Sequence, residues 1–505
     1  MEIRKTNAAI NSRKGRLKNM VKDSSQYLGV ISNFLGELNL EDVTPSAHKV
    51  NVDTWLSWYK GNVQNFHTYK IYNGNKEIKI SRKSMQMAKS ACEDWADLLL
   101  NEKVKIMVGE ESKQEILDKV LLKNNFYVKG NQLIEKAFAL GDGAFVEFNT
   151  GNKDNPVEIN YCNAKMIYPL RISNGEVIDC AFCWMIDEDV YYATVHTRND
   201  DGSYHVLNRI FYEGKNNEIK YYGLPEGVLD EYDSETRLFQ IVMPNSANNI
   251  DIDCDRGISV FANSIDILKD IDLKFDGYDT EFSLGRKRAF VNSSVSKFNT
   301  DDKGNITPTF DPEDIVFYSM DMSENEKSIE FVDPQLRVEQ FDRALQTSLN
   351  LYGDSVGFGT NHYSFKDGVT YTNQTQIISS NSKMYRRLKK HELVLEKSLI
   401  DLANAILYLV TNTINEADVS IDFDDSIIED TAEKQRQALL EYNAQLIDAT
   451  QYFMQTRNMD EATAKAFVKS ITDRQPSPEE ELDPEEDDEA KVIKKGIKDS
   501  KNTGE

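Results

Sequence analysis

The sequence predicts an α+β protein, and three features of its apolar pattern support this fold class. Apolar residues recur at helical spacing between residues 81 and 123. From about residue 124 to 245 the chain changes to short runs rich in Tyr, Val, Ile and Phe, separated by Gly, Asn and Asp, a pattern typical of antiparallel strands and hairpins. Further on, two long helical stretches enclose a short β-rich insert.

Length and composition indicate a folded protein of several parts. With 505 residues, the chain has room for about two to four structural units. Hydrophobic residues make up 40% of it and aromatic residues 10%, which is outside the range of disordered chains. The five cysteines are odd in number and sparse, so we expect no disulfide framework and a reducing cytosol.

No segment is predicted to enter or cross a membrane. Residues 1–20 contain scattered charges and no apolar core, so we expect no secretory signal peptide. The most apolar long stretch, residues 393–410, is interrupted by Glu396, Lys397 and Asp401, which is too much charge for a bilayer span. We therefore expect a buried or interfacial helix there and no membrane partner.

The first helical stretch, residues 81–123, is predicted as a packed helix with Ser81 available as its N-cap. The strand-like runs that follow include residues 144–148, 166–171 and 190–196, with a turn at Asp201-Gly202. The apolar face of the helix predicted over residues 81–123 comprises Met85, Ala88, Cys92, Trp95 and Leu99.

The arrangement of helix, insert and helix is the most informative pattern in the chain. Residues 257–285 are predicted as one amphipathic helix of about 27 residues, roughly 40 Å long, which suggests a strut. Strand-like runs return in residues 286–333 around the polar turn 301–305, and a second helix follows over 334–352. The stripe of the first helix is formed by Phe261, Ile265, Leu268, Phe275, Tyr278 and Phe282.

The last third of the chain is predicted to be mainly helical. A glycine-rich loop, residues 353–372, precedes a long helix over 374–411 and a short strand at 421–423. The capping box Asp430-x-x-Glu433 opens a helix to about residue 455, and a last helix covers roughly 459–472. The remaining predicted segment is an acidic and then basic tail, expected to be disordered, over residues 475–505.

Two motifs resemble metal sites but do not complete one. The run Asp251 to Asp255 begins like a calcium loop, but Arg256 stands where that loop requires glycine and Ala262 stands where it requires glutamate. Cys180 and Cys183 have zinc-like spacing, but no second pair exists, and on a strand two positions three apart point to opposite faces. We expect no metal.

No catalytic constellation is visible either. The six histidines are scattered, without a zinc-protease pattern or a nucleophile elbow. Gly357 and Gly359 lack the Gly-Lys-Ser/Thr of a phosphate-binding loop, so flexibility or close backbone approach is the better account of them. We therefore expect no enzyme and no cofactor.

Two basic clusters could bind phosphates or form ion pairs with an acidic neighbouring subunit. For the cluster Arg386, Arg387, Lys389 and Lys390 we favour ion pairs, because the chain contains 84 acidic residues. For the cluster Arg286, Lys287 and Arg288, at the junction of helix and insert, both interpretations stay open.

Three strings in this order resemble the siphophage type of bacteriophage portal protein, the SPP1-like portal family. They are residues 89–101 (KSACEDWADLLLN), 355–359 (SVGFG) with 363–365 (YSF), and 375–386 (TQIISSNSKMYR). The resemblance covers about residues 20–470 and rests more on the order of segments than on any one string. Related portals often carry a Lys-Thr-Ala-Thr-Glu run before the third string, whereas this chain reads YTNQTQ, so local contacts there can differ.

The resemblance implies a portal fold with a wing of helices and antiparallel sheet, two long stem helices, a small β-rich clip and a helical crown. In sequence order the implied parts are the wing 1–256, the first stem helix 257–285, the clip 286–333, the second stem helix 334–352, the tunnel loop 353–372, the wing-to-crown helices and crown 373–474, and the tail 475–505.

The resemblance also implies a function and partners. It implies a ring, usually of twelve subunits, that forms the DNA channel at one capsid vertex of the virion, after assembly in the host cytoplasm. The clip would dock the terminase large subunit during packaging and head-completion or adaptor proteins afterwards. The wing would contact the major capsid and scaffolding proteins, and double-stranded DNA would pass through the channel during packaging and ejection.

The net charge of −25 fits a channel through which DNA slides better than a protein that binds DNA tightly. Each neutralised phosphate adds affinity through counterion release, so a lining that bound phosphates tightly would stall DNA. Asp266, Asp270 and Asp276 lie largely off the apolar stripe of the first stem helix, and we expect some of them to face the channel; a solvated outer face is the alternative. The tunnel-loop candidates are Gly357, Phe358, Gly359, His362, Tyr363 and Phe365, with an ordinary interdomain loop as the alternative.

Two other functions stay open at the level of sequence. A metal-dependent phage nuclease could use Asp422, Asp424 and Asp425, although acids between a strand and a capped helix are also ordinary turn chemistry. The second of these functions is that of a monomeric scaffold or adaptor of the phage head.

Overall fold

The computed structural model describes most of the chain in two compact units, residues 1–424 and 425–505. The described residues are 24–72, 74, 76–151, 155–214, 217–225, 227–285, 287–292, 299–300, 306–307, 317–320, 329–364, 374–423, 431–457, 459 and 461–472. No described helix combines the length and the apolar character needed to cross a bilayer.

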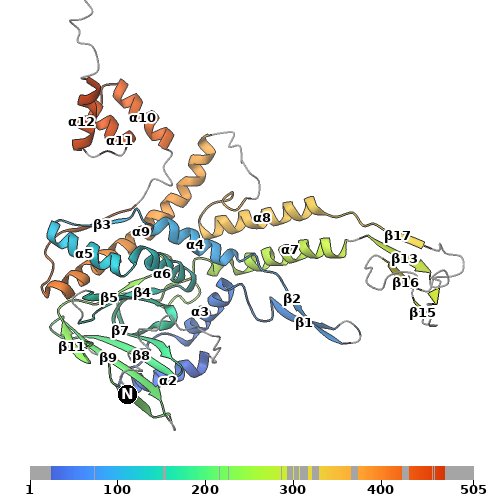
Figure 1. The fold of residues 1–505 in the computed structure, drawn as a ribbon, viewed down its shortest axis with the longest axis horizontal. Helices are drawn as coiled ribbons and strands as arrows, with labels where there is room; N and C mark the ends of the chain where they lie inside the picture. The colour runs from blue at the N-terminus through green and yellow to red at the C-terminus, as the bar shows by residue number, and fades with distance from the viewer. Residues whose placement is uncertain are drawn as a thin grey trace, which may run out of the picture. The chain divides into compact units, whose positions relative to one another are not determined.

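The first unit begins with helices and one hairpin (Figure 1). The predicted helix over 81–123 is wrong, because this stretch contains two helices with a strand between them. Residues 105–108 alternate between exposed and buried side chains and pair with a strand near residue 420, which extends the chain there. Ser81 ends a strand, and Gln86 precedes the helix instead. The elements in order are α2 Ser24–Glu37, α3 Ser46–Tyr59, β1 Thr68–Tyr72, β2 Glu77–Ser81, α4 Met87–Leu99, β3 Lys105–Val108, α5 Glu111–Lys123 and α6 Phe126–Leu140.

Two antiparallel sheets follow, as the sequence predicts for this region, although α6 occupies its beginning. The larger sheet has six strands in the order β10-β9-β8-β7-β6, with β11 also paired to β9, and the smaller has the order β12-β4-β5. Their bounds are β4 Gly143–Asn149, β5 Val157–Asn163, β6 Ile167–Ser173, β7 Glu176–Asp187, β8 Val190–Arg198, β9 Tyr204–Glu213, β10 Ile219–Tyr222, β11 Glu231–Ser234 and β12 Phe239–Val242.

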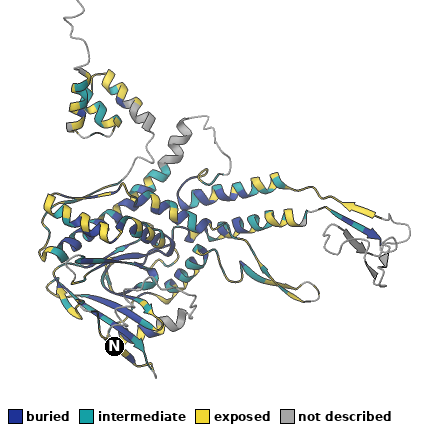
Figure 2. Cartoon of the chain, viewed as in Figure 1, coloured by how far each residue is buried: buried dark blue, intermediate teal, exposed yellow. Residues whose placement is uncertain are grey.

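Both faces of the large sheet are buried (Figure 2). On one face Phe34 of α2 stacks on Phe211 with ring centroids 4.1 Å apart, and Cys183 lies in the same cluster. On the other face Phe182 packs against Phe239 at 5.3 Å, and Cys180 lies in that cluster. The two cysteines therefore point to opposite faces of β7, as predicted, and their thiols do not converge.

The helix predicted over 257–285 begins later, because its first residues make other backbone contacts. A Cβ at Gly257 would lie 2.0 Å from the carbonyl oxygen of Gly141, and the Val260 N–H donates to the Phe138 carbonyl at 3.0 Å. These contacts hold the segment outside the helix. A 3-10 turn, Ala262–Ser264, precedes α7, Ile265–Leu284.

The predicted β-rich insert and second helix are present. In the insert, β13 lies between β16, to which it is parallel, and β17, to which it is antiparallel. The helix α8, Val338–Val356, extends past its predicted end at residue 352. The strands are β13 Arg288–Asn292, β14 Asn299–Thr300, β15 Ile306–Thr307, β16 Phe317–Met320 and β17 Ile329–Val332.

The long helix predicted over 374–411 is confirmed as α9, Gln374–Thr411. The strand β18, Val419–Asp422, pairs with β3. The second unit contains α10, Thr431–Asn443, α11, Ala449–Arg457, and α12, Glu461–Thr472. The single helix predicted up to residue 455 is divided there, where Gln445 has a φ of 59°.

Candidate functional site: the paired long helices and the turn after them

The two long helices α7 and α8 form an antiparallel pair (Figure 1). At the end near the sheets, the hydroxyls of Ser264 and Ser355 lie 2.7 Å apart. Near the β-rich insert, the Arg337 guanidinium donates twice to Glu281, at 3.0 and 2.6 Å. Aromatic packing between the helices lies between these two ends, with Tyr278 and Phe341 at 5.6 Å. The pair therefore stays in contact along its length.

The three acids proposed for the channel have different surroundings. Asp266 is 93% exposed and pairs with Lys269 one turn away. Asp270 lies toward α8, where it accepts hydrogen bonds from Lys274 and from Ser348, both at 2.6 Å. Partial burial alone would raise the pKa of Asp270, but these two donors hold it below its ordinary value.

Asp276 and two other acids of α7 hold the root of the β1–β2 hairpin. Asp276 accepts from the backbone N–H of Lys83 at 3.0 Å, and the Lys83 ammonium pairs with Asp279 at 2.7 Å. Asp272 is buried and accepts from the Met85 N–H at 2.8 Å. Among the residues that the structure describes, Asp266 is therefore the one of the three channel candidates whose carboxylate contacts only its own helix.

The turn after α8 packs on α4. Phe358 is 4% exposed and stacks between Trp95, at 4.6 Å, and His362, at 4.4 Å. Asp94 accepts from the Tyr363 hydroxyl at 2.9 Å and lies 3.0 Å from the His362 ring nitrogen. Burial, with Asp94 nearby, raises the pKa of Tyr363. The described part of the tunnel-loop candidate is thus anchored; Phe365 lies outside the described residues.

The glycines here allow close approach of the backbone. A Cβ at Gly353, inside α8, would lie 2.5 Å from the Gly359 carbonyl oxygen. Gly357 ends α8 with a φ of 111°, and its Cβ would lie 2.6 Å from the Arg387 guanidinium. Of the two purposes expected for such glycines, close approach is the one that these distances support.

The three strings that carry the family resemblance meet at this turn. Trp95, from the first string, donates its indole N–H to the Val356 carbonyl of the second at 3.2 Å. Lys383, from the third, pairs with Asp354 at 2.6 Å. Arg387, next to the third string, donates to the Ser355 carbonyl at 3.1 Å. Segments more than two hundred residues apart in sequence therefore form one packed cluster.

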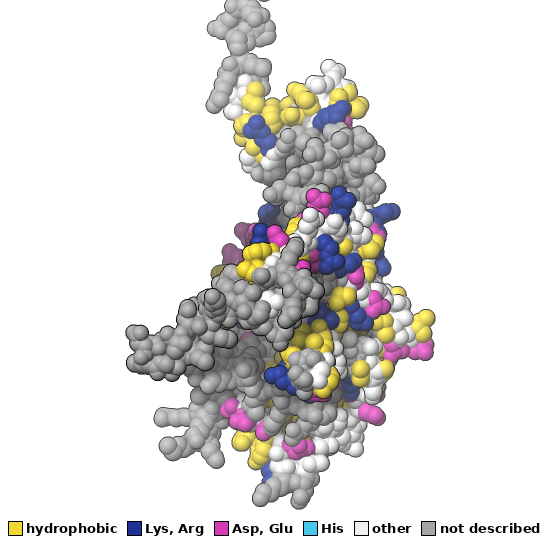
Figure 3. Space-filling view, turned by 90° about the vertical axis from the view of Figure 1, so that its right-hand side faces the viewer, with side chains coloured by type: hydrophobic (Ala, Val, Ile, Leu, Met, Phe, Trp, Pro, Cys, Tyr) yellow, Lys and Arg dark blue, Asp and Glu magenta, His cyan; other side chains and the backbone are white. Residues whose placement is uncertain are grey.

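The basic clusters are partly engaged within the chain. In the cluster on α9, Lys389 pairs with Glu392 at 2.9 Å, and the side chains of Arg386 and Lys390 are exposed. In the other cluster, Lys287 pairs with Asp333 at 2.8 Å, Arg288 begins β13, and Arg286 lies outside the described residues. On the face shown in Figure 3, acidic and basic side chains are interspersed.

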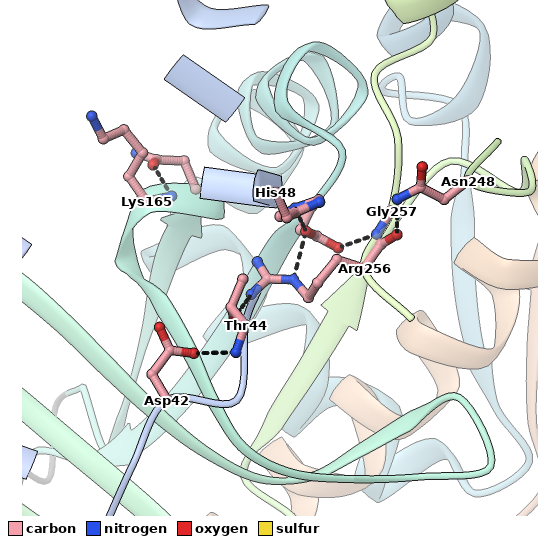
Figure 4. A network of polar contacts seen from close by, with 9 residues as sticks. Asp42, Thr44, His48, Lys165, Asn248, Arg256 and Gly257 are labelled. Carbon is pink, nitrogen blue, oxygen red and sulfur yellow. Dashed lines mark hydrogen bonds and ion pairs between the residues drawn. The ribbon is translucent and has the colours of Figure 1, made fainter. Parts of the chain in front are cut away.

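A buried polar network fixes the segment that leads into α7 (Figure 4). The Arg256 guanidinium donates to Asp142 at 2.8 Å and to the Thr44 hydroxyl at 3.0 Å. Asp142 also accepts from the Gly257 N–H at 3.1 Å, and His48 lies 3.8 Å from its carboxylate. Burial alone would raise the pKa of Asp142, but Arg256 and the other donors lower it to about 2.

Sequence reasoning missed several residues of this region. The sequence does not indicate that Asp272 and His67 form a buried pair, or that Asp94 is the acceptor for the turn after α8. A signal existed for Asp94 and Trp95 only, because both lie in the first string of the resemblance. His67 and Asp272 are 205 positions apart, and no sequence pattern links them.

The chain matches the family described as "Phage portal protein, SPP1 Gp6-like" over residues 46–476. No curated protein matches it significantly. It is similar to a chain of the virion of a native gene transfer agent particle, with 11% identity and a TM-score of 0.38, covering 84% of this chain and 98% of that one.

Two chains from particle necks are similar at the same level. For the neck of the empty gene transfer agent particle, the identity is 10% and the TM-score 0.38, with coverage of 73% of this chain and 87% of the other. For the neck of the native particle, the values are 11% and 0.36, with coverage of 72% and 88%.

Proposed function

The chain belongs to the SPP1 Gp6-like family of phage portal proteins, and from this premise we propose that it forms the ring-shaped DNA channel at one capsid vertex. The ring would usually contain twelve subunits. The observation that carries the proposal is the family match over residues 46–476, which includes both long helices and the insert between them.

The parts of the chain receive these roles in the proposal. Residues 1–256 form the wing, 257–285 and 334–352 the stem helices, and 286–333 the clip. The tunnel loop is residues 353–372, and the wing-to-crown helices and crown are 373–474. The antiparallel contact of α7 and α8, with the β-rich strands between them in sequence, supports a stem that carries a clip.

The partners follow from these roles. The clip docks the terminase large subunit during packaging and the head-completion or adaptor protein afterwards. The wing contacts the major capsid and scaffolding proteins, and the crown faces the capsid interior. Double-stranded DNA passes through the channel in packaging and ejection, and the protein moves from the host cytoplasm into the virion. In this role it hydrolyses no ATP.

Electron microscopy of the purified full-length protein tests the proposal. We expect turbine-like rings with a central hole, and native mass spectrometry should give a mass near twelve subunits. A compact monomer in both measurements would overturn the portal ring in favour of a monomeric head scaffold or adaptor. Cleavage of DNA by the same preparation, dependent on an added divalent metal, would instead support the nuclease; Asp424 and Asp425 of that hypothesis lie outside the described residues.

A further inference from the structure

The β1–β2 hairpin is a two-stranded sheet to which no other described strand is paired. Its register joins Thr68 to Ser81 at the root and Tyr72 to Glu77 near the tip. Beyond an isolated bridge between Gln64 and Thr68 at the root, both outer edges present backbone groups that are paired with no other described strand. An isolated hairpin is at best marginally stable in water, and unpaired edges favour contact with another chain.

The root of this hairpin is firmly held by α7. His67 precedes β1, and its Nδ1 accepts from the Val63 N–H at 2.8 Å. This leaves Nε2 to donate to Asp272, at 2.8 Å. Ser84, after β2, donates to the same carboxylate at 2.9 Å. Both sides of the root thus converge on one buried acid.

Arg82 completes the root. Its guanidinium lies over the rings of Phe66 and Tyr69, at 4.3 and 5.0 Å, and donates to the Phe66 carbonyl at 2.8 Å. A hairpin fixed in this way at its base presents its outer part in a defined direction, which reduces the entropy lost on binding.

The outer part of the hairpin is apolar and basic. Ile71 is 45% exposed and Tyr72 is 70% exposed, and Figure 2 shows the strands exposed or half-buried along their length. The two strands with the turn between them carry three lysines and one glutamate, namely Lys70, Lys76, Lys79 and Glu77. This segment is therefore positive in a chain whose net charge is −25.

A loop of the same chain has the opposite charge and a similar apolar content. In the loop before α7, Ile250 is 46% exposed and Ile252 is 86% exposed. Between and after them stand Asp251, Asp253 and Asp255, and among the cations that the structure describes none is within ion-pair distance of these three. The loop therefore offers an acidic and apolar surface that none of the described cations neutralises.

We infer that the β1–β2 hairpin of one copy docks on the Asp251–Asp255 loop of a second copy. The inference rests on the proposed ring, because rings are built by head-to-tail contacts in which two different patches of each subunit meet. Exposed apolar side chains on both patches favour a protein partner over DNA, and opposite charges select the pairing and its register.

Zero-length cross-linking tests the contact in the assembled protein. Rings are assembled from a mixture of unlabelled and ¹⁵N-labelled subunits and treated with a carbodiimide, which joins Lys79 to a carboxylate in contact. We expect peptides that link Lys79 to the loop and that pair one light with one heavy chain. Links from Lys79 that are confined to single chains, or that reach other acidic segments of the neighbour, would overturn the inference.

Charge-sign variants test it independently in the full-length chain. Ile71→Asp with Tyr72→Asp places acids against the acidic loop, and we expect the fraction of subunits in rings to fall at least tenfold by native mass spectrometry. Ile71→Lys with Tyr72→Lys removes the same apolar groups but keeps the positive charge of the hairpin, so it should assemble less well than the wild type and clearly better than the aspartate variant. Equal assembly of the two variants would contradict the proposed partner.

The controls separate this inference from the proposed function. Tyr222→Asp, at a 45% exposed tyrosine on the edge strand β10, should assemble normally. If the wild type itself forms no ring, the proposed function fails and the inference, which rests on the ring, fails with it; if the wild type forms rings, the hairpin variants judge the inference alone. If Lys79→Glu lowers the affinity of intact rings for duplex DNA in fluorescence anisotropy without changing assembly, the hairpin is a nucleic-acid contact and the inference is wrong.

Discussion

Two buried carboxylates near the start of the smaller sheet have opposite pKa shifts. Asp142 and Glu147 are both 0% exposed. Asp142 lies beside Arg256 and its pKa is lowered to about 2, whereas burial raises the pKa of Glu147 to about 8. The donor to Glu147 is the neutral amide of Gln240, at 2.6 Å with its nitrogen turned toward the carboxylate. A full positive charge, rather than burial alone, decides which acid is ionised.

Glu147 should make the stability depend on pH. The folded protein keeps its proton up to a pH of about 8, whereas the unfolded chain loses it near 4.5. The contribution of Glu147 to the free energy of unfolding is therefore full below pH 4.5 and is lost as the pH rises through 8. The loss amounts to at most about 1.4 kcal/mol per pH unit. In Glu147→Gln this loss should disappear, so the difference in Tm between variant and wild type should grow in favour of the variant from pH 5.5 to 8.5. A constant difference would contradict the raised pKa.

The glycines of the long helices should respond differently to alanine. A Cβ at Gly353 meets a backbone oxygen at 2.5 Å, whereas at Gly277 it meets the Phe341 ring at 3.4 Å. Gly353→Ala should destabilise the protein by about 1–3 kcal/mol through overpacking. Gly277→Ala, the matched control, should be neutral or stabilising by up to about 1 kcal/mol. Urea unfolding of both variants measures this, and the reverse order would show that the turn after α8 is not packed as described.

At the scale of elements, a helix or strand could be predicted where the burial of its own side chains gives a periodic pattern. A boundary could not be predicted where a contact with a distant part of the chain sets it. The helix over 374–411 and the alternating strands around Cys180 and Cys183 follow local periodicity. The break of the first predicted helix at residues 105–108 depends on pairing with β18, more than three hundred residues away. Likewise, Gly257 stays out of α7 because Gly141 approaches it, and a single sequence does not reveal that approach.

The acidic face of α7 shows the same limit. The sequence indicates acids off the apolar stripe, and solvent or a channel is the natural expectation for them. In the structure Asp272 is buried under His67 and Ser84, and Asp276 and Asp279 engage Lys83. Their spacing is visible in the sequence, but the partners come from the hairpin root, whose position is a tertiary property.

Removing Asp272 should release the hairpin. Asp272→Ala leaves the His67, Ser84 and Met85 donors without their acceptor, which should cost at least about 2 kcal/mol of stability. Hydrogen exchange of residues 63–85 should accelerate more than exchange in the large sheet. Asp266→Ala, on the same helix but 93% exposed, is the control and should leave exchange unchanged. Uniform acceleration in both variants would contradict the specific role of Asp272.

At the scale of the whole molecule, the acidity of the chain bears on how DNA would move through the proposed ring. A weakly attractive lining lets DNA slide, because fewer condensed ions are released on contact. Asp266 is 93% exposed and pairs only with Lys269 of its own helix among the described residues, a difference from Asp270 and Asp276 that the sequence alone does not show.

Asp266→Lys should impede packaging while rings still form. A lysine at this position in each subunit would add a circle of phosphate-binding charges to the channel. The measurement is the yield of nuclease-protected DNA in an in vitro packaging reaction, with ring mass determined in parallel and Asp266→Asn as the control. Packaging by Asp266→Lys at the wild-type level would show that this carboxylate does not face DNA.

Other elements of the chain hold the α7–α8 pair near the sheets and in its middle. Near the sheets, Asp272 accepts from the Met85 N–H just before α4, and the Tyr352 hydroxyl donates to the Met87 carbonyl of α4 at 3.0 Å. In its middle, Asp276 and Asp279 hold Lys83 of the hairpin root, and nearer the insert Arg337 of one side pairs with Glu281 of the other. Mechanically the pair is a cantilever, fixed near the sheets and extending toward the insert. A sideways force on β13 would therefore bend it about the segment that α4 and the hairpin root hold. Trp95, which stacks on Phe358, belongs to α4. A force on α4 would therefore also act on this stacked pair.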